Sequence, residues 1–211
     1  METDLFIFSI IVLIFSVIIH EVAHGWAANS LGDPTAKLAG RLTLNPIRHI
    51  DPVGTILIPL LLKLSGSPFL FGWAKPVPYN PYNLRNQRWG EAFVAVAGVA
   101  TNLFLAILFG LLARYAYATG SIAFGDLAAV IVLMNLFLGI FNLLPIPPLD
   151  GYTFLRSILP HKSAMAFRNF ENRLMQGGFL TLIVFLLVFS YFLAKPFTAL
   201  VLYLFRLIVG V

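Results

Sequence analysis

Two histidines four positions apart, His20 and His24, enclose Glu21 near the end of an apolar run that begins at Leu5. On an α-helix, residues four apart point almost the same way, about 6 Å apart along the axis, so both imidazoles could bind one metal ion. In such an H-E-x-x-H arrangement the glutamate activates a water molecule that fills the metal's fourth position. The alternative is a pair of core histidines that hydrogen-bond to neighbouring hydroxyls, but this alternative leaves Glu21 without a purpose.

The composition predicts a polytopic membrane protein. Of the 211 residues, 59% are hydrophobic and 11% are charged, whereas soluble domains carry about 25% charged residues. Ionisable groups within a membrane helix are costly unless they serve a function, which favours the metal site. The net charge of +5 could indicate nucleic acid, but the Lys and Arg residues flank apolar spans, so membrane orientation explains them and we expect no nucleic-acid partner. The absence of cysteine excludes disulfides and a thiolate nucleophile or ligand.

The apolar segments predict about five transmembrane helices in one integral-membrane domain, residues 1–211. These segments cover residues 5–31, 90–118, 122–144, 178–194 and 197–211. The last two would form a C-terminal helical hairpin (about 178–211), because Lys195-Pro196 separates them. The segment 53–64 is apolar but short and contains Pro59, so we expect it to be re-entrant or interfacial.

Two stretches between the first two full spans have the character of extended chain. Residues Leu42–Leu44 lie in an alternating pattern, and Ala74–Val77 lie in a region rich in proline, glycine, asparagine and tyrosine. The expected fold is therefore all-α with short membrane-associated β strands. A strand beside the site could bind an unwound substrate segment by β-addition.

A third metal ligand is expected, because a catalytic zinc usually has three protein ligands and one open position. Asp150 stands out among the few acids, since a proline-rich break at the end of an apolar span holds it. Unwound backbone at membrane depth is tolerated only when it is buried in protein or lines a water-filled cavity, and a hydrolytic site needs such a cavity. An ordinary Asp-Gly turn is the alternative interpretation. His49 and His161 are not expected to be ligands, and Asn135 is interpreted as an interhelical hydrogen-bonding group.

Two motifs taken together resemble the site-2 protease family of intramembrane zinc metalloproteases, peptidase family M50. They are HEVAH at residues 20–24 and NLLPIPPLDG at residues 142–151. The stretches 40–46, 49–55 and 72–80 are similar to the compact prokaryotic members, which have no PDZ domain. The resemblance covers about residues 5–160, the expected catalytic core. Where many members carry Gly-Pro, this chain has Gly98 followed by Val99, which leaves the role of Asn102 open.

The resemblance implies one Zn²⁺ per chain, with His20, His24 and Asp150 as ligands and Glu21 as the catalytic base. It also implies that Asn142 binds or polarises the substrate peptide. The implied activity is hydrolysis of a peptide bond within or near a transmembrane segment of a membrane protein, as in regulated intramembrane proteolysis. The identity of the substrate, the trigger, the oligomeric state and any regulatory membrane partner that gates access stay open.

Two other classes of function remain as alternatives. A divalent-metal transporter also places histidines and acids inside the membrane, but it would distribute ligands over several helices along a path. A non-catalytic membrane binding protein would not require the Glu21 carboxylate.

The placement of the ligands and the basic residues predicts the topology. The ligand-bearing ends of the first and third full spans must lie on one side of the membrane, so 53–64 cannot cross. Residues 32–89 hold seven of the fourteen Lys and Arg residues, and residues 145–177 hold four more. By the positive-inside rule, the active-site end then faces the cytoplasm in a multi-pass cell-membrane protein, and five crossings put the C-terminus inside.

Overall fold

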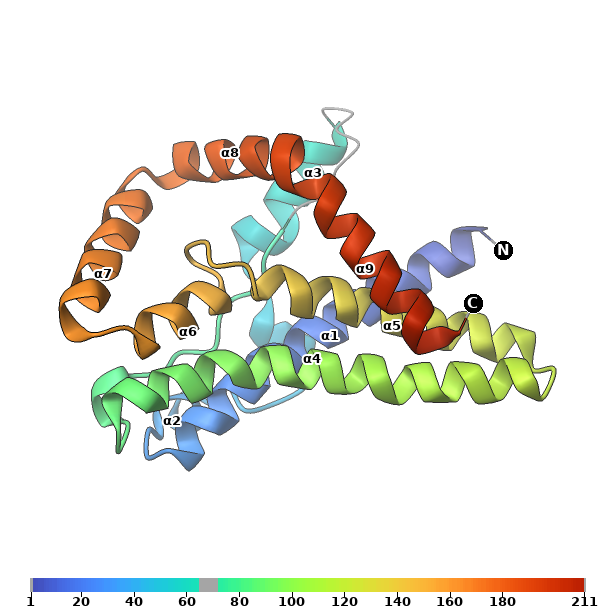
Figure 1. Cartoon of the computed structure of the whole chain (residues 1–211), viewed down its shortest axis with the longest axis horizontal. Coiled ribbons are helices and arrows are strands. Elements are labelled where there is room, and N and C mark those ends of the chain that lie inside the picture. The colour runs from blue at the N-terminus through green and yellow to red at the C-terminus, as the bar shows by residue number, and fades with distance from the viewer. Residues whose placement is uncertain (1, 65–71, 211) are drawn as a thin grey trace.

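The computed structural model describes residues 2–64 and 72–210, which are mostly helical. Three long helices form its centre: α1 (Glu2–Ser30), α4 (Gln87–Ala118) and α5 (Ile122–Asn142). Figure 1 shows α4 lying along both α1 and α5. The shorter elements are α2 (Thr35–Leu38), η1 (Pro46–His49), η2 (Pro52–Leu57), α3 (Ile58–Leu64), η3 (Pro81–Asn83), α6 (Asp150–Ile158), α7 (His161–Gln176), α8 (Gly178–Val188), η4 (Phe189–Leu193) and α9 (Ala194–Val209).

The ends of the central helices follow from local sequence. After α1, Gly32 adopts a positive φ of 109° and Pro34 follows it, so the helix cannot continue. At the start of α4, the Asn86 side chain accepts a hydrogen bond from the Trp89 N–H, which satisfies one of the unpaired donors of the first turn. Gly120, with φ of 80°, makes the tight turn between α4 and α5.

The main core lies between α4, α5 and α9. Its buried members on α4 and in the first two turns of α5 are three alanines, Ala106, Ala113 and Ala128. Small residues let helix backbones approach closely where there is no hydrophobic force to drive helices together in lipid. Larger side chains fill the rest of the core, including Leu136 on α5 and Phe197 on α9. This tight pairing fixes the helix faces from which the polar residues described below project.

Four helical stretches in the described part of the chain are long and apolar enough to cross a membrane. They are Asp4–Ser30, Trp89–Ala118, Ile122–Asn142 and Ile183–Val209. The expected total of about five is not confirmed, because 178–209 is one bent helical stretch, with η4 between α8 and α9, and not a hairpin of two spans. Arg114 near the end of α4 donates hydrogen bonds to the carbonyls of Leu207 and Ile208. The C-terminal end of α9 therefore lies beside the α4–α5 turn, and not at the other end of the bundle as five crossings require (Figure 1).

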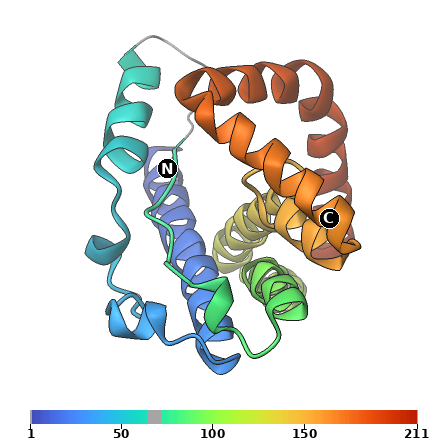
Figure 2. The ribbon, with the colours of Figure 1, turned by 90° about the vertical axis from the view of Figure 1, so that its left-hand side faces the viewer.

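The chain between α1 and α4 packs outside the three-helix centre (Figure 2). Within the described residues, the segment around 53–64 consists of η2 and α3, which together cover Pro52–Leu64 and are shorter than a membrane-spanning helix. The expected β strands are not confirmed: no strand occurs in 2–64 or 72–210. Residues 72–80 nevertheless have backbone partners at alternate positions, with the Trp73 N–H bonded to the Gly54 carbonyl and the Lys75 N–H bonded to the His49 carbonyl.

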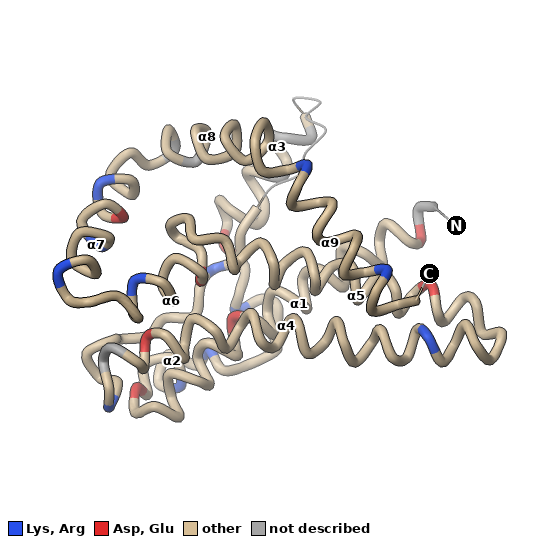
Figure 3. The backbone as a smooth tube through the Cα atoms, in the orientation of Figure 1, with Lys and Arg blue, Asp and Glu red and all other residues tan. Residues whose placement is uncertain are grey.

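Charged residues concentrate at one end of the molecule. Figure 3 shows Lys, Arg, Asp and Glu residues around α2, α6 and α7, while α4 and α5 carry few charges toward the turn that joins them. The charged end is the one at which α1 ends and α6 begins, so it is also the end that carries the histidine motif and Asp150.

Candidate metal centre

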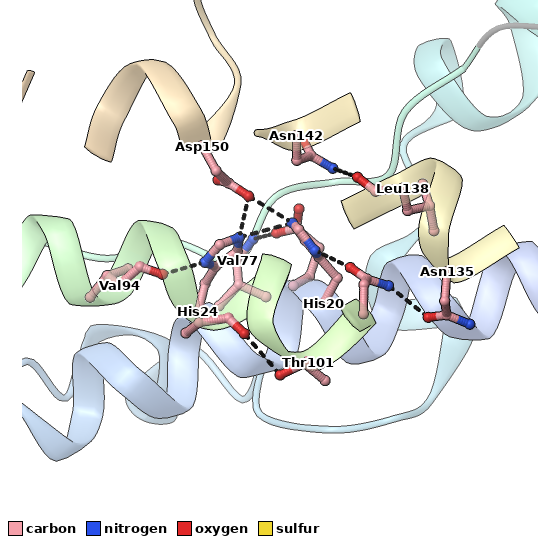
Figure 4. A network of polar contacts seen from close by, with 12 residues as sticks. His20, His24, Val77, Val94, Thr101, Asn135, Leu138, Asn142 and Asp150 are labelled. Atoms are coloured by element: carbon pink, nitrogen blue, oxygen red, sulfur yellow. Dashed lines mark hydrogen bonds and ion pairs between the residues drawn. The ribbon is translucent and has the colours of Figure 1, made fainter. Parts of the chain in front are cut away.

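Three side chains from two distant parts of the sequence converge within the bundle. His20 and His24 project from α1, and Asp150 is the first residue of α6. The Nε2 atoms of the two histidines lie 3.0 Å apart, and the Asp150 Oδ2 lies 3.0 Å from the His20 Nε2 and 3.3 Å from the His24 Nε2. Figure 4 shows the three side chains pointing toward one another. They are the one group of three or more possible ligands found among the described residues.

Hydrogen bonds at the far ring nitrogens fix the protonation of both imidazoles. The His24 Nδ1 lies 2.7 Å from the Val94 carbonyl oxygen, which can only accept, so this nitrogen carries the proton. The His20 Nδ1 lies 2.5 Å from the Asn102 Oδ1. Donation from Nδ1 leaves a lone pair on each Nε2, which is the arrangement that metal-ligating histidines adopt.

The orientation of the Asn102 amide follows from a chain of contacts that ends at a backbone carbonyl. The Asn135 Nδ2 donates to the Ile131 carbonyl and to the Ser16 Oγ, at 2.9 and 3.0 Å. The Asn135 Oδ1 must therefore accept from the Asn102 Nδ2, at 2.8 Å. This leaves the Asn102 Oδ1 to accept from His20. Three helices are thus connected by amide hydrogen bonds that fix the His20 tautomer.

The cluster fits a metal ion on chemical grounds. Two nitrogen lone pairs and a carboxylate oxygen face one another in a site where His20 is 5% exposed. The Asp150 Oδ2 is buried and has no hydrogen-bond partner. Such a collection of acceptors is unfavourable unless a cation lies between them. Two imidazoles and a carboxylate are one of the three-ligand sets found in catalytic zinc sites.

Two glycines make the close approach possible. A Cβ atom on Gly98 of α4 would lie 2.6 Å from the His20 Cε1 and 2.6 Å from the His24 Nε2. A Cβ atom on Gly151 would collide with the carbonyl of Leu143. The Gly98 position thus leaves room for both imidazoles, and the Gly151 position lets the chain fold back so that Asp150 reaches them.

Glu21 lies beside the cluster and is held by the chain that precedes α4. It is three residues from His24 on the same helix, so the two side chains are neighbours. The Glu21 Oε2 accepts a hydrogen bond of 2.8 Å from the backbone N–H of Val77. Val77 is buried and belongs to the segment 72–80, in which Ala74–Val77 were expected to be extended.

Asp33 fixes this segment to the end of α1. Its carboxylate is fully buried and accepts hydrogen bonds from the Thr35 backbone and hydroxyl, the Asn80 N–H and the Asn83 side chain. Burial alone raises the pKa of Asp33, but these donors stabilise the charged form more strongly, so the net pKa is lowered.

The remaining polar residues lie as follows. Asn142 comes from the last turn of α5, and its Nδ2 donates to the Leu138 carbonyl one turn back, at 3.0 Å (Figure 4). It is not part of the cluster of His20, His24 and Asp150. His49 is buried and contacts the Thr43 carbonyl through Nε2, and His161 is exposed at the start of α7. Neither of these two histidines joins the cluster. Sequence reasoning left Asn102 open, although its fully buried side chain is the direct partner of His20.

Comparison with known proteins supports the same chemistry. The family model described as "Peptidase family M50" matches residues 112–185, which include Asp150. A Bacillus subtilis protein named "Putative zinc metalloprotease YwhC" is 42% identical over 158 residues, which cover 72% of this chain and 68% of the relative. A Mycolicibacterium smegmatis protein named "Putative zinc metalloprotease Rip2" is 30% identical over 174 residues, or 82% of this chain and 64% of the relative. No solved structure matches the chain significantly.

The relatives and the geometry lead to one assignment. The Bacillus subtilis relative exceeds 30% identity over more than two thirds of its own length. The family match, in turn, lies over the segment that delivers Asp150 to the histidines. The chain therefore belongs to peptidase family M50 and is a metalloprotease.

Proposed function

We propose that this protein is an intramembrane zinc endopeptidase that cleaves a peptide bond within or beside a transmembrane segment of another membrane protein. The observation that carries the proposal is the convergence of His20, His24 and Asp150 inside the bundle. His20 lies ten residues before the end of a helix that is apolar enough to span, or about 15 Å along its axis. A peptide bond that reaches this site must therefore enter below the membrane surface.

In this proposal His20, His24 and Asp150 hold one zinc ion. When bound, zinc polarises the scissile carbonyl and lowers the pKa of water in its open position. Asn102 and the Val94 carbonyl keep both imidazoles in the tautomer that presents Nε2 to the metal. Because the amide chain from Ile131 fixes this tautomer before any substrate arrives, the ligand geometry needs no rearrangement during the reaction.

Glu21 serves as the general base. Its carboxylate takes the proton of the attacking water and delivers it to the leaving amide nitrogen. The Val77 N–H orients the Glu21 carboxylate through the 2.8 Å hydrogen bond, and that bond engages only Oε2. Asn142, at the end of α5, donates a hydrogen bond to the substrate once it turns from the Leu138 carbonyl.

A transmembrane substrate hides its carbonyls in helical hydrogen bonds, so it must unwind before cleavage. The segment 72–80 offers an extended neighbour for the unwound chain. The N–H groups of Trp73, Lys75 and Val77 are bonded within the protein, and Pro76 and Pro78 have none. The Trp73 and Lys75 carbonyls already accept hydrogen bonds from Thr55 and Arg41, so a substrate strand would donate its own N–H groups to the other carbonyls of this segment.

The protein would be a multi-pass protein of the cell membrane whose active-site end faces the cytoplasm. Basic residues gather at that end, and the α4–α5 turn at the other end has none between 119 and 121. Cysteines placed singly at Lys162 and Ser121, both exposed, should label from opposite sides of the membrane. Labelling of both from one side would contradict this arrangement.

The same three-donor cluster argues against the transporter alternative. A path for ions needs successive sets of ligands, and the described residues contain one set. Retention of Glu21, held beside His24 by the Val77 N–H, favours catalysis over a binding role alone.

The decisive experiment separates the metal from the chemistry. Purified wild type, His24→Ala and Glu21→Gln are reconstituted with a tagged single-span protein, and zinc content and cleavage are measured. Glu21→Gln should keep zinc and lose about 10²–10⁴-fold in rate, as expected for a positioned general base. His24→Ala should lose both. Near wild-type cleavage by Glu21→Gln, or full zinc occupancy in His24→Ala, would refute the proposal. Membrane proteomics of cells carrying Glu21→Gln would then identify single-span proteins that accumulate uncut.

A further inference from the structure

A buried carboxylate outside the metal centre, Glu91, connects α4 to α6. Glu91 is 6% exposed and lies in the second turn of α4. The Glu91 Oε2 forms an ion pair of 3.1 Å with the Arg156 Nη2 and lies 3.4 Å from the Ser157 Oγ. Both of these partners belong to α6, and the Glu91 Oε1 also forms an ion pair of 3.4 Å with the Arg168 Nη2 of α7. The mechanism above uses none of these four residues.

The face of α4 that carries Glu91 also carries each α4 group that contacts the histidines. Glu91, Val94, Gly98 and Asn102 are spaced by three, four and four residues, so they form one stripe along the helix. Val94 accepts from His24, Gly98 makes room for both imidazoles, and Asn102 accepts from His20. Val94, Gly98 and Asn102 in this stripe therefore position α1, and Glu91 in the same stripe contacts α6.

The proposed metal ligand Asp150 and the Glu91 partner Arg156 both belong to the short helix α6. Asp150 is the first of its nine residues and Arg156 is the seventh, about 9 Å away along the axis. The chain before α6, residues 143–149, is not helical, so α6 is a separate helix and not a continuation of α5. A nine-residue helix moves as a unit, so fixing Arg156 against α4 fixes Asp150.

We propose that Glu91 is a positioning residue which, through Arg156, holds α6 on α4 so that Asp150 meets His20 and His24 at the metal. This inference rests on the proposed zinc site and adds a residue to it. Loss of the Glu91 charge lets α6 shift, moves Asp150 away from the imidazoles and weakens zinc binding. Supporting residues of metal sites typically contribute about 10–100-fold in affinity, and we expect an effect in this range.

The structure offers a matched control in Glu171 of α7. The Glu171 Oε2 pairs with the Nη1 of the same Arg156, at 2.5 Å, but it connects α6 to α7 and not to α4. Glu171→Gln removes one carboxylate charge from the same cluster and leaves the α4–α6 connection intact. It should therefore bind zinc nearly as tightly as wild type. Glu91→Asp, which keeps the charge on a shorter side chain, should recover part of the affinity lost in Glu91→Gln.

The test measures zinc affinity by competition with a fluorescent chelator in purified full-length protein, together with thermal unfolding without zinc. A second readout needs no metal: spin labels on cysteines at Phe93 of α4 and Phe154 of α6 report the distance between these helices. Both positions are exposed, and the natural chain has no cysteine. We expect weaker zinc binding and a broader distance distribution in Glu91→Gln only. A role in stability alone would lower the unfolding temperature and leave both readouts unchanged, which would refute the proposal.

Two further outcomes keep the proposals separate. If His24→Ala also binds zinc, the metal-site assignment itself fails. If His24→Ala loses zinc while folded Glu91→Gln keeps wild-type affinity, only the positioning role fails. Should Glu91→Gln not fold, Arg156→Lys replaces it, because lysine keeps the charge but cannot bridge two carboxylates with a planar fork. Wild-type affinity and an unchanged distance distribution in Arg156→Lys would likewise overturn the inference.

Discussion

Gly98→Ala is the smallest change that should disable the metal centre. The added Cβ would lie 2.6 Å from the His20 Cε1, 2.6 Å from the His24 Nε2 and 2.7 Å from the His20 Nε2, whereas ordinary contact begins at 3.4 Å. Both rings must therefore move by about 0.8 Å. Neither ring can rotate away cheaply, because the Nδ1 atoms are held by Asn102 and by the Val94 carbonyl.

The size of the effect follows from that displacement. A misplacement of about 1 Å at reacting groups can reduce a rate about 10²-fold, and here two ligands shift together, so we expect at least that loss in cleavage, with weaker zinc binding. Helix propensity acts in the opposite direction, since alanine is favoured over glycine by roughly 1 kcal/mol in a helix interior. The variant should therefore fold, and its defect should be confined to the site.

The assay compares Gly98→Ala with Gly139→Ala, the same substitution on the neighbouring helix. A Cβ on Gly139 meets Leu103 and Asn102 at 3.3 and 3.4 Å, so a shift of a few tenths of an ångström accommodates it. Zinc content and cleavage of a tagged transmembrane substrate are measured for both variants. If Gly98→Ala keeps wild-type zinc affinity and rate, the reasoning from close approach is wrong.

Three other perturbations test separate parts of the site. Asn102→Leu removes the acceptor for His20 and should weaken zinc binding about 10–100-fold in a competition assay, because the His20 tautomer is no longer fixed; unchanged affinity would remove Asn102 from the site. Asn142→Ala should leave zinc content unchanged and lower the cleavage rate about 10²-fold, as for a lost oxyanion donor; a normal rate would limit Asn142 to its contact with the Leu138 carbonyl. Because the pKa of Asp33 is lowered from 3.8, its stabilising effect is present above about pH 4 and lost as the pH falls further. Unfolding temperatures of wild type and Asp33→Asn should therefore differ above pH 4 and converge below it, and a constant difference would contradict the assignment.

The sequence was sufficient for the parts of the site that depend on local spacing. Helical periodicity places His20 and His24 on one face, whatever the rest of the fold is. The break at 145–149 predicts that Asp150 leaves the third full span, and the structure starts α6 at that residue. Hydropathy likewise located α1, α4 and α5 to within a few residues, because long apolar runs leave few alternatives.

Features that depend on how helices pack were not predictable from one sequence. Asn102 and Asn135 looked alike, as polar residues in apolar spans. Their partners are set by the rotation of α4 and α5 about their axes, which the core alanines decide. The prediction of two C-terminal spans is not confirmed for a related reason. Lys195-Pro196 suggested a break between two spans, but proline is tolerated near the start of a helix, and α9 begins at Ala194.

The expected β strands show that an alternating sequence pattern does not by itself predict a strand. Alternation at Leu42–Leu44 and extension at Ala74–Val77 describe single chains, whereas a strand also needs a partner with consecutive hydrogen bonds. Residues 72–80 instead distribute their bonds over Gly54, His49 and the Glu21 side chain. The same extended conformation therefore serves to hold a carboxylate and not to build a sheet.

The proposed metal ligands and the proposed base are held by different kinds of structure. The helices that carry the proposed metal ligands are connected by hydrogen bonds between buried amides and by the Glu91–Arg156 ion pair, and Gly98 lets them approach closely. The partner of Glu21 lies instead on a non-helical segment. The Asp33 carboxylate holds that segment by accepting hydrogen bonds from the Asn80 N–H at 2.6 Å and from the Asn83 side-chain amide at 2.9 Å. Because protonation of Asp33 weakens these bonds, acid strong enough to protonate it should loosen the segment that carries the partner of Glu21.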